Sequence, residues 1–210
     1  MNTVSKILSV ARGEIGTTEK GSNNVAYNDE YYGGPGHNYA WCVVFVWWVF
    51  KHADMSGLFC AGKKMNQCTK VMKYAKDSGC WVTKDYKAGD LLLFDWNGDG
   101  VPEHIGILEY DQEPGGFRLK TIEGNTTNED KSKEGVFRKF RNVSNVLGAY
   151  RPSYPSDEEK PGAWARDACE WAMDSGIIRG YGNGVYGWGS YITREEMAVM
   201  LRRFYELDKE

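Results

Sequence analysis

The sequence predicts an α+β fold in which helices pack on an antiparallel sheet or half-barrel, followed by a small helical unit. Apolar residues recur at helical spacing through the first third of the chain. Short apolar runs separated by Gly, Pro and Asn clusters then extend from Trp81 to Tyr150. Because helices come first and no helical pattern interrupts the later runs, the strands are expected to pair antiparallel. A proline-rich stretch precedes a second helical pattern.

Length and composition are those of a globular protein that can hold one ordinary domain and one small domain. The chain has 210 residues, of which 41% are hydrophobic and 26% are charged. Its net charge of −3 gives no reason to expect binding to nucleic acid or to a membrane surface. Five cysteines without CxxC spacing leave at least one thiol unpaired and favour synthesis in a reducing compartment.

The first third of the chain predicts three helices and one long loop. The first helix carries an apolar face, and residues 16–38, which show no period, are expected to form the loop. The eight residues from Val43 to Phe50 lack any charge, which predicts a buried helix from about Trp41 to Ala53, too short to cross a bilayer. A further helix is expected to end at Ser78 and Gly79. The later strands are predicted at residues 90–94, 104–108, 118–122, 135–137 and 146–150.

The chain is predicted to divide into a domain at residues 1–152, a linker at 153–161 and a helical domain at 162–210. In the last of these, Trp164 and Trp171 are expected on one helix face. Thr193 and Glu196 form a capping-box pattern that predicts the start of the final helix. A unit of this size has too little core of its own, so we expect it to need a partner surface.

Cys42 stands at the first turn of the buried helix, where free backbone N–H groups and the helix dipole favour a thiolate. Most buried cysteines are inert, so a catalytic role requires a base. His52 lies about 15 Å further along the same helix and cannot reach the thiol. His37 belongs to a glycine-rich loop that does not hold a base rigidly, whereas His104 opens a strand beside Gly106. We therefore choose His104 as the base.

Glu123 and Asn125 are the candidates for the group that orients His104. They are spaced i and i+2, which puts both on one face of an extended strand, where both can point at the same imidazole. The alternative is a strand end with two solvated polar residues. The order Cys, His, Glu-x-Asn favours the catalytic interpretation.

An acidic loop before His104 is a candidate calcium site. Asp95, Asn97 and Asp99 place oxygen atoms at alternate positions, as in the first half of an EF-hand loop, and Glu103 could add another. The bidentate glutamate at the twelfth position is missing, because Gly106 stands there. An Asx-rich hairpin turn is the equal alternative.

Three segments of the chain resemble the cysteine, histidine-dependent amidohydrolase/peptidase (CHAP) domain, a papain-like fold of peptidoglycan hydrolases. These are residues 40–46, 103–107 and 122–125, and the likeness extends over residues 1–152. The resemblance implies that Cys42 is the nucleophile, His104 the general base and then acid, Glu123 the orienting group and Asn125 an auxiliary polar group. It implies no required cofactor; some members bind calcium through an acidic loop before the cysteine, which this chain lacks.

The C-terminal unit resembles an S-layer homology (SLH) motif. The likeness rests on residues 164–168, 176–180 and 192–198, which follow the order and spacing of that family. It implies binding to a secondary polymer of the bacterial wall, with Arg194, and less strongly Trp164, as contacts to the glycan. Such motifs normally occur in threes. Because only one copy is found here, three alternatives are open. Three chains assemble into a homotrimer, the unit packs on the catalytic domain, or its binding function is degenerate.

Together the two resemblances imply a phage endolysin that cleaves an amide of peptidoglycan, either the N-acetylmuramoyl-L-alanine bond or a bond within the peptide stem. The N-terminal residues lack the apolar core of a signal peptide, so we expect synthesis in a host bacterial cytoplasm and action at the wall after release. The alternatives are a bacterial autolysin, a catalytically silent wall-binding or assembly protein, and a papain-like hydrolase of some other amide.

Overall fold

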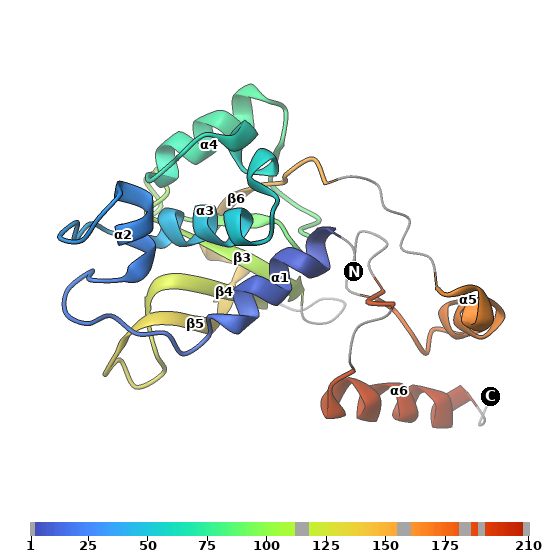
Figure 1. Ribbon diagram of the computed structural model, residues 1–210. Coiled ribbons are helices and arrows are strands. Elements are labelled where there is room, and N and C mark those ends of the chain that lie inside the picture. The colour runs from blue at the N-terminus through green and yellow to red at the C-terminus, as the bar shows by residue number, and fades with distance from the viewer. Residues whose placement is uncertain (1–2, 112–117, 155–160, 181–185, 189–191, 208–210) are drawn as a thin grey trace.

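The structure is a computed structural model that describes residues 3–111, 118–154, 161–180, 186–188 and 192–207. It confirms the predicted α+β fold, with helices on an antiparallel sheet and a small helical unit after them (Figure 1). The predicted linker at 153–161 falls mainly on residues 155–160, which lie outside the described residues.

Four helices precede the sheet. They are α1 (Thr3–Gly13), α2 (Ala26–Tyr32), α3 (Cys42–His52) and α4 (Cys68–Asp77), with two short 3-10 turns at Ser56–Leu58 and Cys60–Gly62. The three predicted helices correspond to α1, α3 and α4, and α4 ends at Ser78 as expected. Val44, Phe45 and Val49 have no exposed surface, because the uncharged run of α3 is covered on nearly every side.

The prediction that residues 16–38 form one long loop is wrong in one respect, because this segment contains α2. This seven-residue helix has no side-chain cap at its start and ends at Gly33, whose left-handed φ of 85° suits glycine. Tyr27 stacks on Trp41 and meets Phe45 edge-on, and Tyr31 packs against Trp47. The helix α2 is therefore stabilised by burial of its aromatic rings against α3, and no local pattern in the sequence predicts it.

Six strands form one sheet in the order β1-β6-β2-β3-β4-β5, and every pair is antiparallel. Their bounds are β1 Trp81–Val82, β2 Leu91–Phe94, β3 His104–Asp111, β4 Arg118–Thr127, β5 Glu134–Asn142 and β6 Val146–Tyr150. All five predicted strands are present, and β1 is an additional short edge strand. A 3-10 turn at Val143–Asn145 joins β5 to β6.

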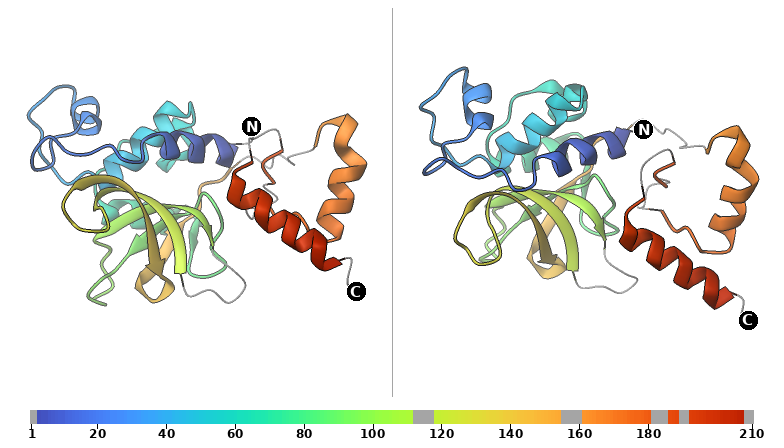
Figure 2. Two further views of the ribbon diagram at one scale, coloured as in Figure 1. Left: turned by 90° about the horizontal axis from the view of Figure 1, so that it is seen from below. Right: turned by 60° about the horizontal axis from the view of Figure 1, so that its bottom comes forward.

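The helices cover one face of this sheet. Figures 1 and 2 show α1 and α3 lying across it, and α3 packs against β3 and β4. Alternate residues such as Leu91 and Ile105 face the main core under the helices, whereas Leu92 and Leu108 belong to a smaller cluster. The first turn of α3 is thereby held over the strands that carry His104 and Glu123.

The C-terminal unit contains α5 (Arg166–Asp174) and α6 (Arg194–Leu207), which lie beside each other and apart from the sheet in Figures 1 and 2. Trp171 of α5 meets Phe204 of α6 edge-on. The predicted capping box is confirmed, since the Thr193 hydroxyl accepts from the Glu196 N–H and the Glu196 carboxylate accepts from the Thr193 N–H.

The sequence spacing predicted that Trp164 and Trp171 share one helix face, and this prediction is wrong. Trp164 lies in a 3-10 turn at Ala163–Ala165 before α5, and its side chain is 94% exposed. The backbone leaves the α-helical spacing there, so the period that begins at Trp164 does not continue into α5.

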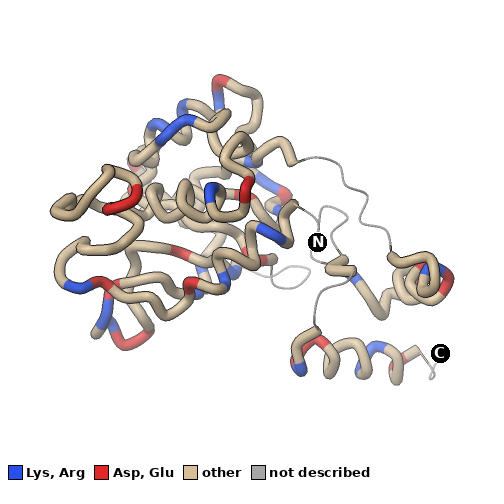
Figure 3. Tube along the Cα trace, in the orientation of Figure 1, with Lys and Arg blue, Asp and Glu red and all other residues tan. Residues whose placement is uncertain are grey.

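Charged residues of both signs are interspersed along the described chain (Figure 3). None of the helices in the described part of the chain is long and apolar enough to cross a membrane.

Candidate active site

Cys42 is the first residue of α3 and lies in the main core cluster. The helix start is fixed from both sides: the Trp41 carbonyl accepts the first helical hydrogen bond from Phe45, and the Trp41 N–H donates to Asn125 Oδ1 at 3.1 Å. Because α3 is buried along its length, its first turn cannot move independently of the core. The sulfur therefore has a fixed position at the edge of the sheet.

His104 and Glu123 come from neighbouring strands, β3 and β4, and they meet directly. His104 Nε2 donates to Glu123 Oε2 at 3.0 Å, and both side chains are buried. Gly106 makes this approach possible, because a Cβ at that position would lie 2.7 Å from Glu123 Cγ. The glycine that the sequence places beside His104 thus leaves room for the orienting carboxylate.

The imidazole of His104 and the thiol of Cys42 also interact, and each shifts the pKa of the other. Since Nε2 is occupied by Glu123, Nδ1 is the ring nitrogen left to exchange a proton with the sulfur. Burial opposes the charged ring, but the hydrogen bonds to Cys42 and Glu123 prevail and raise the pKa of His104 to about 9. Hydrogen bonds from Cys68, His104 and the Val43 N–H hold the pKa of Cys42 well below its ordinary value. The pair therefore favours thiolate and imidazolium.

Besides His104, two further side chains hold the Glu123 carboxylate. Arg141 on β5 grips it with two parallel N–H donors, Nε to Oε1 at 2.8 Å and Nη2 to Oε2, and the Thr121 hydroxyl donates to Oε1 at 2.6 Å. Burial disfavours the carboxylate, yet Arg141 and His104 lower the pKa of Glu123 to about 2. The carboxylate is thus kept ionised and fixed in orientation.

Trp96 lies on the solvent side of the ion cluster that Glu123 forms with His104 and Arg141. The Arg141 guanidinium lies 4.9 Å from the Trp96 ring centre, and Trp96 stacks on Phe94 with the ring planes 6° apart. The Trp96 ring is 42% exposed and its centre lies 6.4 Å from that of His104. The partly exposed indole therefore borders the site.

Asn125 does not point at the imidazole, contrary to the prediction from its i+2 spacing. Its Oδ1 accepts from the Trp41 N–H, and its Nδ2 donates to Asn23 Oδ1 at 3.1 Å. The extended geometry behind the prediction fails because Asn125 has a left-handed φ of 55° and the pairing of β4 with β5 shifts between Glu123 and Thr126. Asn125 instead anchors the start of the helix that carries Cys42.

Comparison with known proteins matches this part of the chain to one family. The CHAP domain matches residues 34–125, which include Cys42, His104, Glu123 and Asn125. This part of the chain is therefore similar to CHAP domains. The S-layer homology domain matches residues 157–198, and the likeness expected from both sequence patterns is thereby confirmed.

Two solved structures are similar to the chain. "Crystal structure of a wild type endolysin LysIME-EF1" has 17% sequence identity and a TM-score of 0.41, and the match covers 73% of this chain and 66% of that one. "The crystal structure of Ly7917" has 16% identity and a TM-score of 0.42, with 71% and 62% covered. The chain thus spans less than two thirds of the length of either solved protein. No curated protein matches it.

Two residues beside Cys42, His104 and Glu123 were not found from the sequence. Cys68, the first residue of α4, places its Sγ 3.9 Å from that of Cys42, and Arg141 binds Glu123. Arg141 is one of three basic residues of β5, with Arg138 and Lys139, and such a group is typical of a solvated strand. The spacing of Cys68 from Cys42 matches no motif. Only the pairing of strands and helices brings either residue to the site.

In the candidate calcium loop, side-chain oxygens of Asp95, Asn97 and Asp99 accept hydrogen bonds from the loop's own backbone N–H groups. Asp95 accepts from the N–H groups of Gly98 and Gly100, Asp99 Oδ1 accepts from that of Val101, and Asn97 Oδ1 from that of Asp99. Glu103 Oε2 accepts from the Trp96 N–H. Within the described ranges, no group of three or more His, Cys, Asp or Glu could hold a metal ion. The arrangement matches the Asx-rich turn, and calcium binding stays a prediction.

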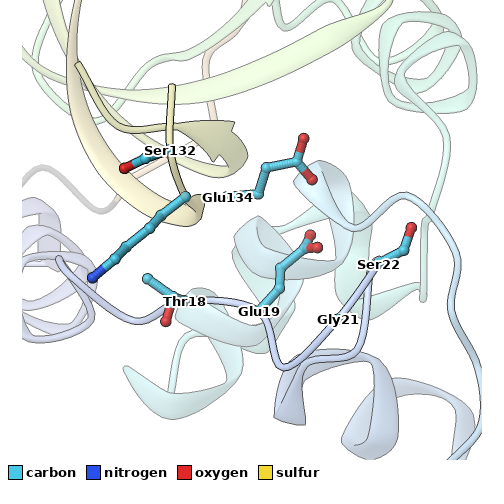
Figure 4. A pocket seen from close by; sticks show the side chains of 7 residues that line it. Thr18, Glu19, Gly21, Ser22, Ser132 and Glu134 are labelled. Atoms are coloured by element: carbon cyan, nitrogen blue, oxygen red, sulfur yellow. The ribbon is translucent and has the colours of Figure 1, made fainter. Parts of the chain in front are cut away.

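A polar pocket of about 390 Å³ lies between the segment around Glu19 and the start of β5 (Figure 4). Its lining includes Thr18, Glu19, Lys133 and Glu134, but not Cys42, His104 or Glu123. Glu19 connects it to the site, because its Oε1 accepts from the Trp41 indole N–H at 2.8 Å. The pocket thus borders the residues that anchor the start of α3.

The two candidate glycan contacts lie in different parts of the C-terminal unit. Trp164 precedes α5, and Arg194 is the first residue of α6, next to the Thr193 cap; both side chains are exposed. Their role in binding a wall polymer stays a prediction.

Proposed function

We propose that the protein is a peptidoglycan hydrolase in which a CHAP domain cleaves an amide bond through a Cys42 thioester. The observation that carries this proposal is the buried chain of contacts from the Cys42 thiol through His104 to Glu123 and Arg141. This order of nucleophile, base, orienting carboxylate and fixed counter-ion is what acyl transfer by cysteine requires. CHAP domains generally act on peptidoglycan as cysteine- and histidine-dependent amidohydrolases or peptidases.

The reaction follows from the geometry of these groups. The Cys42 thiolate attacks the carbonyl carbon of the scissile amide, and the oxyanion accepts a hydrogen bond from the Cys42 backbone N–H. His104 then gives its Nδ1 proton to the departing amine, which leaves a thioester on Cys42. A water molecule, deprotonated by His104, hydrolyses the thioester and releases the acid. Glu123 keeps the imidazole oriented throughout.

We assign to this activity either the N-acetylmuramoyl-L-alanine bond or a bond within the peptide stem. The S-layer homology match supports a wall-directed C-terminal unit, with Arg194 and Trp164 as contacts to a secondary wall polymer. This combination fits an endolysin released from a host cytoplasm, and it fits a bacterial autolysin equally in its chemistry.

The test uses purified Gram-positive peptidoglycan and whole cells. Wild type should clear a suspension, whereas Cys42→Ala should lose at least about 100-fold in rate because the nucleophile is gone. Cys80→Ala is the matched control, since Cys80 lies at the β1 end of the sheet and is expected to leave lysis intact. Mass spectrometry of the digest identifies the bond, because cleavage creates a new amino terminus at one position.

Equal clearing by Cys42→Ala and wild type would exclude thiol catalysis. Binding of both proteins to the wall without release of fragments would instead support a silent wall-binding protein. Hydrolysis of simple peptide amides but not of peptidoglycan would indicate a papain-like hydrolase with another substrate.

A further inference from the structure

A second thiol lies directly against the candidate nucleophile. Cys42 opens α3 and Cys68 opens α4, and their sulfur atoms are 3.9 Å apart although the residues are 26 positions apart in sequence. Both side chains are buried, and both thiols are reduced in the structure. The nearest sulfur to the catalytic one is therefore a second cysteine that the hydrolytic mechanism does not use.

The two sulfurs differ in their protonation. The hydrogen bond between them holds the pKa of Cys42 well below its ordinary value and raises the pKa of Cys68, so Cys42 carries the negative charge and Cys68 keeps its proton. A thiolate reacts with peroxides, whereas a neutral thiol does not. A neutral neighbour can, however, resolve the oxidised product once it gives up its proton.

Cys60 shows what a buried thiol looks like without such a partner. It is also fully buried, but burial raises its pKa to about 12, and its backbone rather than its sulfur makes the nearby hydrogen bond to Tyr150. Cys60 is therefore expected to stay inert under conditions in which Cys42 is oxidised.

We propose that Cys42 and Cys68 form a redox pair that a peroxide converts reversibly into a disulfide. In the first step the Cys42 sulfur attacks one peroxide oxygen and becomes a sulfenic acid, while the other oxygen leaves as water. In the second step the Cys68 sulfur attacks the Cys42 sulfur, a new S–S bond forms and the sulfenic hydroxyl leaves as a second water. Two thiols are thus oxidised by two electrons, and hydrogen peroxide is reduced to two waters.

The arrangement favours this outcome over irreversible damage. The sulfurs have to close from 3.9 Å to about 2.05 Å, while each stays at the first turn of its helix. A resolving thiol in contact with the sulfenic acid competes with a second peroxide that would otherwise produce a sulfinic acid. The disulfide ties up the nucleophile, so hydrolysis stops until a thiol reductant restores it; this last consequence rests on the proposed function.

The experiment treats the full chain with hydrogen peroxide and examines it before and after dithiothreitol. We expect a cross-linked peptide pair joining Cys42 and Cys68, lighter by two hydrogens than the sum of the reduced peptides. We also expect peptidoglycan hydrolysis to fall at least about tenfold and to return to most of its starting value on reduction. The mass measurement does not depend on hydrolysis, so a failure of the proposed function is distinguishable from a failure of the redox pair.

Cys68→Ser is the test variant, because it keeps a polar hydroxyl beside Cys42 but cannot form the disulfide. Each protein is compared with its own activity before oxidation. Cys68→Ser should be inactivated by peroxide without recovery, and its Cys42 peptide should carry two or three oxygens. Cys80→Ser is the matched control and should recover as wild type does.

Two results would overturn the proposal. One is oxidised wild type that carries only sulfinic or sulfonic acid on Cys42, with no link to Cys68. The other is Cys68→Ser that recovers as fully as wild type, which would show that Cys68 does not resolve the oxidised sulfur.

Discussion

The N-terminal and C-terminal units use apolar side chains in opposite ways. In the N-terminal unit, Phe45 has no exposed surface and packs among aromatic rings and the strands beneath α3. In the C-terminal unit, Phe204 is 53% exposed although it occupies the apolar face of α6. Other apolar residues of α6 are also exposed: Met197, Val199, Leu201, Tyr205 and Leu207.

This difference shows where the stability of each unit comes from. The N-terminal unit buries a continuous core, and its candidate active site is held by the buried ion pairs of Glu123 with His104 and Arg141. The C-terminal unit depends on local features, the capping box at Thr193 and the contact of Trp171 with Phe204. A site that must hold a sulfur within hydrogen-bond distance of a base needs the first kind of support.

The largest expected effect is on a matched pair of Phe→Ala substitutions, one in each unit. Phe45→Ala should lower the free energy of unfolding of the N-terminal unit by about 3–5 kcal/mol, because it leaves a cavity under α3. Phe204→Ala should cost about 1 kcal/mol or less, since half of that ring is already in water. Urea denaturation followed by circular dichroism measures both.

Phe45→Leu covers the case in which Phe45→Ala does not fold, and it should fall between wild type and Phe45→Ala. Equal losses for the two alanine variants would break the comparison, because they would mean that α6 is buried as deeply as α3.

The second expected effect concerns the ion cluster of the N-terminal unit. Arg141→Met removes both donors from Glu123 while roughly keeping the side-chain volume, and it should lower kcat/KM about 100-fold. The pKa of Glu123 should rise from about 2, because a buried carboxylate then loses its guanidinium partner. The acid limb of the activity profile should move to higher pH.

The free energy of unfolding should also depend on pH through Glu123, and Arg141→Met should shift this dependence to higher pH as well. The folded pKa of Glu123 lies below its ordinary value of 4.5, so its contribution is present above pH 4.5 and is lost as the pH falls towards 2. In Arg141→Met this contribution is already reduced at neutral pH, and acid unfolding should begin at higher pH. Arg141→Lys, which keeps the charge but not the two-pronged contact, should be intermediate; an unchanged pH profile in Arg141→Met would refute the role of Arg141.

The smallest expected effect is local to α6. Thr193→Ala removes the hydroxyl that accepts from the Glu196 N–H at 3.1 Å, which should cost about 1 kcal/mol of helix stability. Amide hydrogen exchange in the first turn of α6 should accelerate several-fold, while exchange in α3 stays the same. Thr193→Ser keeps the hydroxyl and should behave as wild type. Acceleration in α3 as well would mean that the two units unfold together.

Local patterns in the sequence predicted much of this molecule. The uncharged run after Cys42 predicted α3, alternating short runs predicted the strands, and the Thr193–Glu196 spacing predicted the cap. The contact of His104 with Glu123 was also predicted, because Glu123 was a candidate on a neighbouring strand for the group that orients His104. Asn125 was placed on the wrong side, since a single left-handed residue breaks the two-residue period.

The sequence by itself therefore determined where most helices and strands lie, and it indicated Cys42, His104 and Glu123 as the candidate site residues. Periodicity and end signals act over a few residues, and a single chain displays them directly. The tertiary structure alone decided that Arg141 reaches Glu123, that Trp96 covers it and that Cys68 meets Cys42. Those contacts depend on strand order and helix packing, which join residues far apart in sequence through burial rather than through any local pattern.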